Sequence, residues 1–261
     1  MKNLKELEMC PCKGLAKSYS VLVSIDSTNN YVKEHCDVLP DGHLVIAHEQ
    51  LGGRGRQGKS FYSPKDSGLY MSLLIKDERI CNDSLFTAKL SLCVCRAIDA
   101  LTGTNNNNGV GIKWVNDVYF GSKKLCGILC ERFTAGDGKK YVVAGIGINM
   151  KLDVSKLPKD LRHNVTSIFD ITKKEYDKYT LCSNILCEFE RVFGENFSDT
   201  MALEEYRRRS VVIGREISIV AEDASIRAAA LDICDDGSLL VRTEDGCTRK
   251  LCGGEITIRV K

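Results

Sequence analysis

A glycine-rich stretch at residues 53–60 carries three cations, Arg54, Arg56 and Lys59. Glycine lets backbone approach a ligand closely, and guanidinium and ammonium groups suit an anionic one. A reaction that joins a nucleotide to a carboxylate brings like charges together, so it needs such cations. The stretch therefore predicts a loop that binds an anionic substrate, with a solvated basic turn as the simpler alternative.

The same residues satisfy the phosphate-binding pattern G-x-x-x-x-G-K-S, which requires a helix that starts at its Lys-Ser end. Pro64 removes a backbone donor and pushes Ser63 out of helical dihedral angles, and Gly68 follows four residues later. Residues 69–75 are apolar and predict a strand. Because no helix has room to form, the sequence disfavours a P-loop nucleotide hydrolase.

Short hydroxyl and amide side chains gather at Asp26-Ser27-Thr28-Asn29, and Gln50 follows one strand later. Together they could direct several hydrogen bonds at a neutral polar group such as a urea or an amide. Residues of these types also cap helices, and from the local sequence alone capping is the preferred interpretation.

A third group of candidates lies in the middle of the chain. Asp117, at a strand end, could hold Mg²⁺ or accept a proton, and Asn116 could orient a nucleotide. Trp114 is the only tryptophan and could stack on an apolar ligand. The alternative is that Trp114 is core and that Asn116-Asp117 make a turn.

The apolar run that follows contains a lysine and a glycine of interest. Strand alternation puts Lys124 and Gly127 on opposite faces, and both faces are apolar, so alternation does not identify a buried lysine. Gly127 indicates close approach of a ligand or another backbone. Asn149 ends a further strand with little side-chain bulk and could contact a nucleotide.

The elements that position these groups mix strands and helices. We expect strands at residues 21–25, 44–47, 69–75, 111–114, 124–131 and 141–147, and helices from Asp26-Ser27-Thr28-Asn29 to about Cys36, from Asn82-Asp83-Ser84 to Leu101, and at about 175–193 and 199–209. Residues 105–108 make a polar loop. Short β segments follow Ser210, with turns at Glu222-Asp223, Asp235-Asp236-Gly237 and Glu244-Asp245-Gly246. The pattern predicts an α+β domain over residues 1–209 and a small β-barrel over 210–261.

Composition narrows the class of protein. The chain has 261 residues, a net charge of +2, 43% hydrophobic and 28% charged residues, and no apolar run of about 20 residues. A nucleic-acid or membrane partner is therefore not expected. The 13 cysteines include two C-x-C pairs, Cys10/Cys12 and Cys93/Cys95, but no C-x-x-C pair, and no secretory segment precedes them. We interpret most as small buried hydrophobes in a reducing cytoplasm, with no tightly bound metal.

The ordered motifs resemble the signature of biotin–protein ligases from about residue 21 to 170. The segments that carry the resemblance are Asp26-Ser27-Thr28-Asn29, residues 53–59, Ser63-Pro64, residues 113–117, residues 124–129 and Gly147-Ile148-Asn149, and Gly253-Gly254-Glu255-Ile256 resembles the end of that family's small C-terminal domain. The resemblance implies a class II synthetase-like catalytic domain, with helices on one side of a mixed sheet, and an SH3-like β domain.

The implied reaction has two steps. The biotin carboxylate attacks the α-phosphate of ATP, with Mg²⁺, and gives biotinyl-5′-AMP and pyrophosphate. A lysine amine of a biotin carboxyl carrier protein domain then attacks the acyl carbon and releases AMP. The glycine loop is expected to close over the reactive adenylate and exclude water. A homodimer is also a possibility that the resemblance raises.

Roles carried over by resemblance fall into three groups. The catalytic residues are Lys124, Arg54 and Asp117, with Asp117 also the candidate Mg²⁺ ligand. The biotin-binding residues are Ser27, Thr28, Asn29, Gln50, Arg54, Gly55, Arg56, Lys124 and Gly127. The nucleotide-binding residues are Arg56, Lys59, Phe61, Trp114, Asn116 and Asn149.

The chain departs from the family pattern at two motif positions. Val115 stands where the family usually has proline, and Phe61 where it often has tryptophan. About 20 residues precede the first strand, too few for the winged-helix DNA-binding domain of many relatives, so we expect no operator binding. Two alternatives stay open: a lipoate or octanoate ligase on the same fold, and a non-catalytic sensor of biotin or its adenylate.

Overall fold

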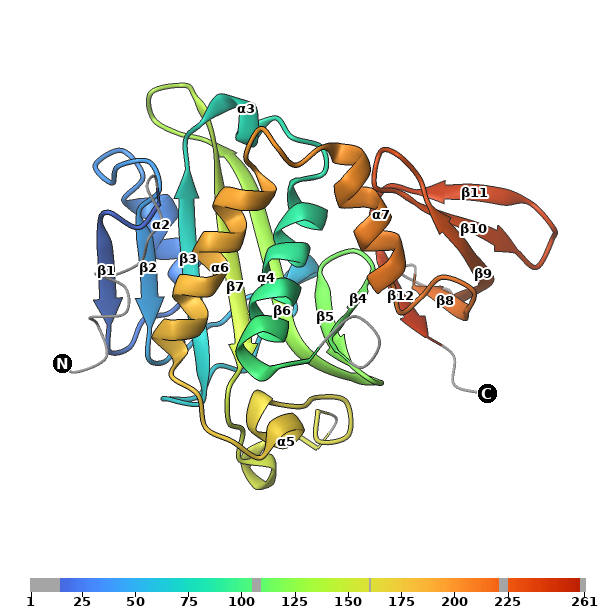
Figure 1. Ribbon diagram of the computed structural model, residues 1–261, viewed down its shortest axis with the longest axis horizontal. Helices are drawn as coiled ribbons and strands as arrows, with labels where there is room; N and C mark the ends of the chain where they lie inside the picture. The colour runs from blue at the N-terminus through green and yellow to red at the C-terminus, as the bar shows by residue number, and fades with distance from the viewer. Residues whose placement is uncertain (1–14, 105–108, 160, 221–224, 259–261) are drawn as a thin grey trace.

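The computed structural model describes residues 15–104, 109–159, 161–220 and 225–258 (Figure 1). Cys10, Cys12, the loop at 105–108 and the turn at Glu222-Asp223 lie outside these residues. The described chain forms a seven-stranded sheet, in the order β1-β2-β3-β7-β6-β5-β4, and a five-stranded sheet. No helix in the described ranges is long and apolar enough to cross a membrane.

The large sheet is mixed, as the sequence predicts. Its strands, in spatial order, are β1 (Tyr19–Leu22), β2 (Leu44–Ala47), β3 (Gly68–Ile75), β7 (Lys140–Asn149), β6 (Lys123–Thr134), β5 (Asp117–Phe120) and β4 (Gly111–Lys113). Only β1 and β2 pair in parallel. The strand expected at 21–25 instead starts at Tyr19 and ends at Leu22. The sequence did not predict β5, because its four residues were interpreted as part of the connection between two neighbouring strands.

The long helices cover one face of this sheet (Figure 1). They are α4 (Phe86–Thr102), α6 (Lys178–Val192) and α7 (Asp199–Arg209). Gly103 ends α4 in the left-handed region, with φ 74°, as expected for a glycine C-cap. Helix α6 begins later than predicted because the Asp177 carboxylate caps it by accepting from the Thr180 amide. The sequence did not predict the short segments α3 (Glu78–Cys81), α5 (Ile168–Thr172), η1 (Arg56–Gly58) and η2 (Val154–Lys156).

A short helix, α2 (Thr28–Glu34), packs on the opposite face of the sheet. Val32 and Cys36 contact Val45, Leu74 and Val143 there, in a hydrophobic cluster separate from the main core. The expectation that helices lie on one side only is therefore wrong. This second face, which α2 covers only in part, carries the candidate site.

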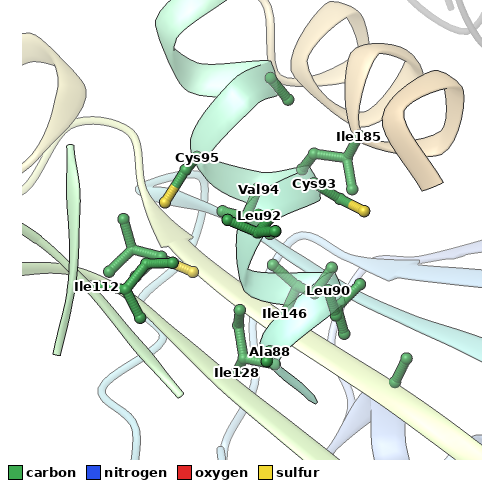
Figure 2. Close-up of a cluster of buried hydrophobic side chains, with 14 of the residues drawn as sticks. Ala88, Leu90, Leu92, Cys93, Val94, Cys95, Ile112, Ile128, Ile146 and Ile185 are labelled. Carbon is green, nitrogen blue, oxygen red and sulfur yellow. The ribbon is translucent and has the colours of Figure 1, made fainter. Parts of the chain in front are cut away.

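Buried cysteines help to fill the main core. Figure 2 shows Cys93 and Cys95 on α4 among apolar side chains of the sheet and of α6. Burial raises the pKa of both thiols, so they stay protonated and behave as small hydrophobes. The interpretation of most cysteines as core residues is confirmed for Cys93, Cys95, Cys126 and Cys182. Within the described ranges, no group of three His, Cys, Asp or Glu residues could hold a metal.

The C-terminal part forms the second, antiparallel sheet. Its strands are β8 (Glu216–Val220), β9 (Ser225–Ile233), β10 (Leu239–Thr243), β11 (Thr248–Leu251) and β12 (Glu255–Ile258), in the order β11-β10-β9-β8-β12. Ile217 and Val241 belong to the same hydrophobic cluster as α4. The Arg207 guanidinium of α7 donates to the Ile233 carbonyl at 2.8 Å. The small β domain is thus packed onto the larger one, and a boundary at residue 209 stays a prediction.

Candidate active site

A cavity of about 260 Å³ opens on the α2 face where the central strands lose their side-chain bulk. Along β7, Tyr141 and Val143 pack beside α2, and then Gly145 and Gly147 follow on the same face. A Cβ atom at Gly145 would lie 2.2 Å from Asn29 Oδ1, and one at Gly147 would lie 2.5 Å from the Phe61 ring. The absence of side chains at Gly145 and Gly147 therefore leaves the space that Asn29 and Phe61 occupy.

Fourteen of the fifteen predicted site residues line this cavity. They are Ser27, Thr28, Asn29, Gln50, Arg54, Gly55, Arg56, Lys59, Phe61, Trp114, Asn116, Asp117, Lys124 and Gly127. Asn149 does not line it; its Nδ2 donates to the Thr166 carbonyl at 2.9 Å and its side chain is buried. The sequence analysis assigned no site role to several other lining residues, although three of them stand in segments that carry the resemblance. These residues include Met71, Gly145, Gly147, Gly254 and Ile256.

One end of the cavity is neutral and densely hydrogen-bonded. We call Ser27, Thr28 and Gln50, which line the cavity, the neutral end, together with Ser63 and Ser72, which bond to them but do not line it. Gln50 Oε1 accepts from the Thr28 amide at 2.9 Å and from Thr28 Oγ1 at 3.1 Å, while its Nε2 donates to Ser63 Oγ at 3.0 Å. Ser72 Oγ lies 2.7 Å from Thr28 Oγ1. Ser72 is a polar residue in the middle of an otherwise apolar strand, and this pattern could have identified it as part of the hydrogen-bonded group.

Ser27 is the N-cap residue of α2, but its hydroxyl makes no capping hydrogen bond. Its side chain is buried and lines the cavity. The capping interpretation from local sequence is therefore right about the position of Ser27 but wrong about its side chain, which does not cap the helix. Ser27 is instead part of the cavity lining, and a role in ligand binding stays a prediction.

Asn29 is braced by the protein on three sides. Its Nδ2 donates to the Leu129 carbonyl at 3.1 Å and to Glu131 Oε2 at 2.9 Å, and Ser72 Oγ donates to its Oδ1 at 2.6 Å. Both amide hydrogens are thus used within the protein. A direct role of Asn29 in ligand binding stays a prediction, and its observed role is to fix the start of α2.

The other end of the cavity is charged. We call Arg56, Asn116, Asp117 and Lys124 the charged end. Arg54 also lines the cavity, and its guanidinium donates to Asn30 on α2. Lys124 Nζ pairs with Asp117 Oδ1 at 2.8 Å, and both side chains are partly exposed. Arg56 donates to Asn116 Oδ1 at 3.4 Å, and Asn116 Nδ2 in turn donates to the Ile128 carbonyl. These groups face the space that an anionic ligand would fill.

A register shift on β6 brings Lys124 into this cluster. Against β5, Asp117 pairs with Gly127 and Val118 with Cys126, but Tyr119 pairs with Lys124, so Leu125 is the extra residue of a bulge. Strand alternation, which put Lys124 and Gly127 on opposite faces, is therefore wrong here. Their proximity is direct, because a Cβ at Gly127 would lie 3.2 Å from Lys124 Nζ.

The C-terminal sheet completes the wall beside the charged end. Gly254 and Ile256 line the cavity, together with Trp114 of the larger domain. The Trp114 indole N–H donates across the domain junction to the Gly237 carbonyl at 3.0 Å. Trp114 is thus both a core residue and a cavity residue, and the two interpretations of its role were not exclusive.

The glycine loop is not a P-loop. Residues 56–58 form one 3₁₀ turn, and the chain then runs to β3 without an α-helix at Lys59-Ser60. The Phe61 ring instead folds back over Gly127 and Gly147, edge-on to Tyr70 at 6.5 Å between centroids. The prediction that no helix starts at Lys59-Ser60 is confirmed.

Two family models match the chain. The biotin/lipoate A/B protein ligase family matches residues 21–149, and the biotin protein ligase C-terminal domain matches residues 212–259. The fold, the cavity and both matches define a protein of the biotin and lipoate ligase class.

Individual relatives sharpen this class. The bifunctional ligase/repressor BirA of Escherichia coli is 29% identical over 93% of this chain and 74% of its own length. A biotin–[acetyl-CoA-carboxylase] ligase of Mycobacterium tuberculosis is 27% identical over 76% and 73%. The structure of Aquifex aeolicus biotin protein ligase in complex with biotin and ATP matches with a TM-score of 0.78 and 27% identity, over 94% of this chain and all of that one. The chain belongs to the biotin–protein ligase family.

Proposed function

We propose that this protein activates biotin with ATP as biotinyl-5′-AMP and then transfers the biotinyl group to a lysine of a carrier protein domain. The observation that carries this proposal is one cavity with a neutral, hydrogen-bonding end joined to a cationic end. A urea ring suits the first end, and a carboxylate meeting a phosphate suits the second. The Aquifex relative, solved with biotin and ATP, has the same fold.

At the neutral end, Ser27, Thr28 and Gln50 are the proposed hydrogen-bonding partners of the ureido ring. The bonds between Thr28 and Gln50 fix both side chains before a ligand arrives, so little order has to be gained on binding. Gly127 leaves room beside Phe61 for the apolar part of the acid. This end would position biotin without taking part in bond making.

At the charged end, Lys124 is the proposed catalytic residue of the first step. The carboxylate oxygen of biotin attacks the α-phosphorus of ATP, and the bond from that phosphorus to the bridging oxygen of pyrophosphate breaks. Lys124, with Arg54 and Arg56, would offset the negative charge that builds up. Asp117 Oδ1 lies 2.8 Å from Lys124 Nζ and would keep the ammonium group in this position before the substrates bind. Lys59, Phe61, Trp114 and Asn116 would adjoin the nucleotide.

The cavity could hold a magnesium ion only together with ATP, because the phosphates would have to supply part of the ion's ligands. Mg²⁺ in nucleotide sites uses one or two protein carboxylates and takes its other ligands from phosphate and water. Asp117 is a single carboxylate in the cavity, which matches that pattern, and it would be the residue that holds the ion. When bound with ATP, the ion would neutralise phosphate charge.

In the second step, a lysine amine of the carrier attacks the acyl carbon of the adenylate and AMP leaves. We propose a biotin carboxyl carrier protein domain as that partner, and a cytoplasmic location. The glycine loop lines the cavity, and we propose that it acts as a lid that shields the mixed anhydride from water. The roles of a homodimer and of carrier docking stay open predictions.

The test is pyrophosphate release from ATP and Mg²⁺ with biotin, with lipoate or with no acid. We expect release that depends on biotin. Release with lipoate alone would keep the fold and change the substrate, and release without any acid would refute the proposal. Transfer is then measured by mass spectrometry of a purified carrier domain, which should gain one biotinyl group on one lysine.

A further inference from the structure

Glu131 lies on β6 just outside the cavity and has no part in the roles assigned above. Strand alternation from Gly127 through Leu129 puts it on the α2 face. Its side chain is 20% exposed. A carboxylate this far buried needs charged or hydrogen-bonding partners to stay ionised.

Three such partners meet at Glu131, and they come from two separate parts of the chain. Oε1 lies 2.9 Å from Lys33 Nζ and 3.4 Å from an Arg54 guanidinium nitrogen, and Oε2 accepts from Asn29 Nδ2 at 2.9 Å. Lys33 and Asn29 belong to α2, whereas Arg54 belongs to the glycine loop. One carboxylate therefore links both to β6.

The partners keep Glu131 charged. Burial on its own raises the pKa of this carboxyl, but hydrogen bonds from Lys33 and Asn29 and the charges of Lys33 and Arg54 outweigh it and lower the pKa below its usual value. An isolated exposed ion pair would contribute little. A half-buried carboxylate with two cations and an amide is a network, in which loss of one member leaves the others unpaired.

Arg54 has a second contact on the same side. It donates to Asn30 Oδ1 at 2.8 Å, and Asn30 Nδ2 donates to Asp26 Oδ2 at 2.6 Å. Because Arg54 also lines the cavity, its guanidinium spans from the loop to α2. The loop is thus tied to the helix at whose start the ureido partners lie.

We propose that Glu131 is a positioning residue that fastens the glycine loop to α2, keeping the lid over the adenylate and the start of α2 in register. This inference rests on the proposed function. In this proposal Glu131 helps to retain biotinyl-5′-AMP in the cavity and takes no part in the chemical step that forms it. Loss of the tether should let the loop open, so that biotin binds less tightly and adenylate escapes.

The test compares the wild type with Glu131→Gln, which keeps an oxygen for Asn29 but removes the charge that pairs with Arg54. We expect the KM for biotin to rise about tenfold while the single-turnover rate constant for pyrophosphate release at saturating biotin changes by less than about threefold. Biotinylation of serum albumin, added as a bystander without a carrier domain, should rise about tenfold. A streptavidin blot measures it.

Two further variants distinguish loss of the contact between the glycine loop and α2 from a general loss of stability. Glu175→Gln removes an exposed pair with Lys151 far along the chain and should leave all three readouts unchanged. Asn30→Ala removes the other contact of Arg54 and should raise bystander labelling in the same direction, which tests the tether even where Glu131→Gln does not fold.

Two results would overturn the inference. One is a folded Glu131→Gln variant with wild-type biotin KM and bystander labelling. The other is an Asn30→Ala variant without any rise in labelling. A wild-type protein that releases no pyrophosphate with biotin would instead refute the proposed function, so the two failures are distinguishable.

Discussion

The neutral end and the charged end of the cavity differ in how completely their polar groups are paired inside the protein. Thr28, Gln50 and Ser63 form a chain of hydrogen bonds before any ligand is present. At the charged end, Arg56 and Lys124 line the cavity together with one carboxylate, Asp117, which pairs with Lys124. The first arrangement is preorganised for a neutral group, and the second leaves excess positive charge for anions that arrive with the substrates.

Because of this difference, substitutions at the two ends should affect different properties of the protein. A change at the charged end should slow the chemical step, because it removes charge that stabilises the transition state. A change at the neutral end should weaken biotin binding or stability, because it disturbs packing and hydrogen bonds already made. The three variants below test the comparison in order of expected effect.

Lys124→Ala should have the largest effect. Removing this ammonium should reduce biotin-dependent pyrophosphate release by about 10²–10³-fold, with little change in the melting temperature, because Lys124 is partly exposed. Stopped-time pyrophosphate assays at saturating biotin and ATP measure it. Lys123→Ala is the matched control, since this exposed neighbour lies on the same strand. Near-normal release from Lys124→Ala would remove Lys124 from the catalytic step.

Gly145→Ala should disturb the neutral end with an intermediate effect. The new methyl group would overlap Asn29 Oδ1, so either Asn29 or the strand must shift. We expect a loss of about 1–3 kcal/mol in the free energy of unfolding and a higher KM for biotin. Denaturant titration and initial-rate kinetics measure the two. Gly52→Ala should be tolerated, because its nearest neighbour would lie at 3.5 Å, and equal damage from both would argue against the packing account.

Trp114→Phe should have the smallest effect and acts where the C-terminal sheet meets the charged end. It removes the indole donor to the Gly237 carbonyl, which should cost about 1 kcal/mol and raise the KM for ATP a few-fold, with the KM for biotin unchanged. Tyr206→Phe is the control, because it removes one hydrogen bond to the Val115 carbonyl within the larger domain. If both variants alter the KM for ATP equally, the contact across the domains has no special role.

The sequence predicted the larger elements and many of the residues that line the cavity, but it misjudged their local geometry. The motif residues line one cavity because several ordered segments had to converge, which the resemblance implied. Strand alternation failed at Lys124, since a single extra residue on β6 reverses which face a side chain occupies. Side-chain capping was not found at Ser27, which lines the cavity, because local propensity does not register a cavity formed by distant segments.

Other features could not be foreseen from local patterns at all. Gly254 and Ile256 reach the cavity from the far end of the chain, and Glu131 joins α2 to the glycine loop through side chains about 100 residues apart in sequence. Such contacts depend on how strands are ordered in the sheet. Asn149 shows the converse: a motif position that the fold places outside the cavity, on the Thr166 carbonyl.

The sequence by itself determined the chemistry that this protein carries: cations in a glycine-rich loop, short hydroxyls and amides near a helix start, and the order of elements that makes an α+β fold. Those properties follow from residue type and spacing, which act locally. Only the tertiary structure decided which groups face one another, because register, a bulge and the packing of the second sheet set distances between segments far apart in the chain. The pairing of Lys124 with Asp117 and the three-way contact of Glu131 are products of that second level.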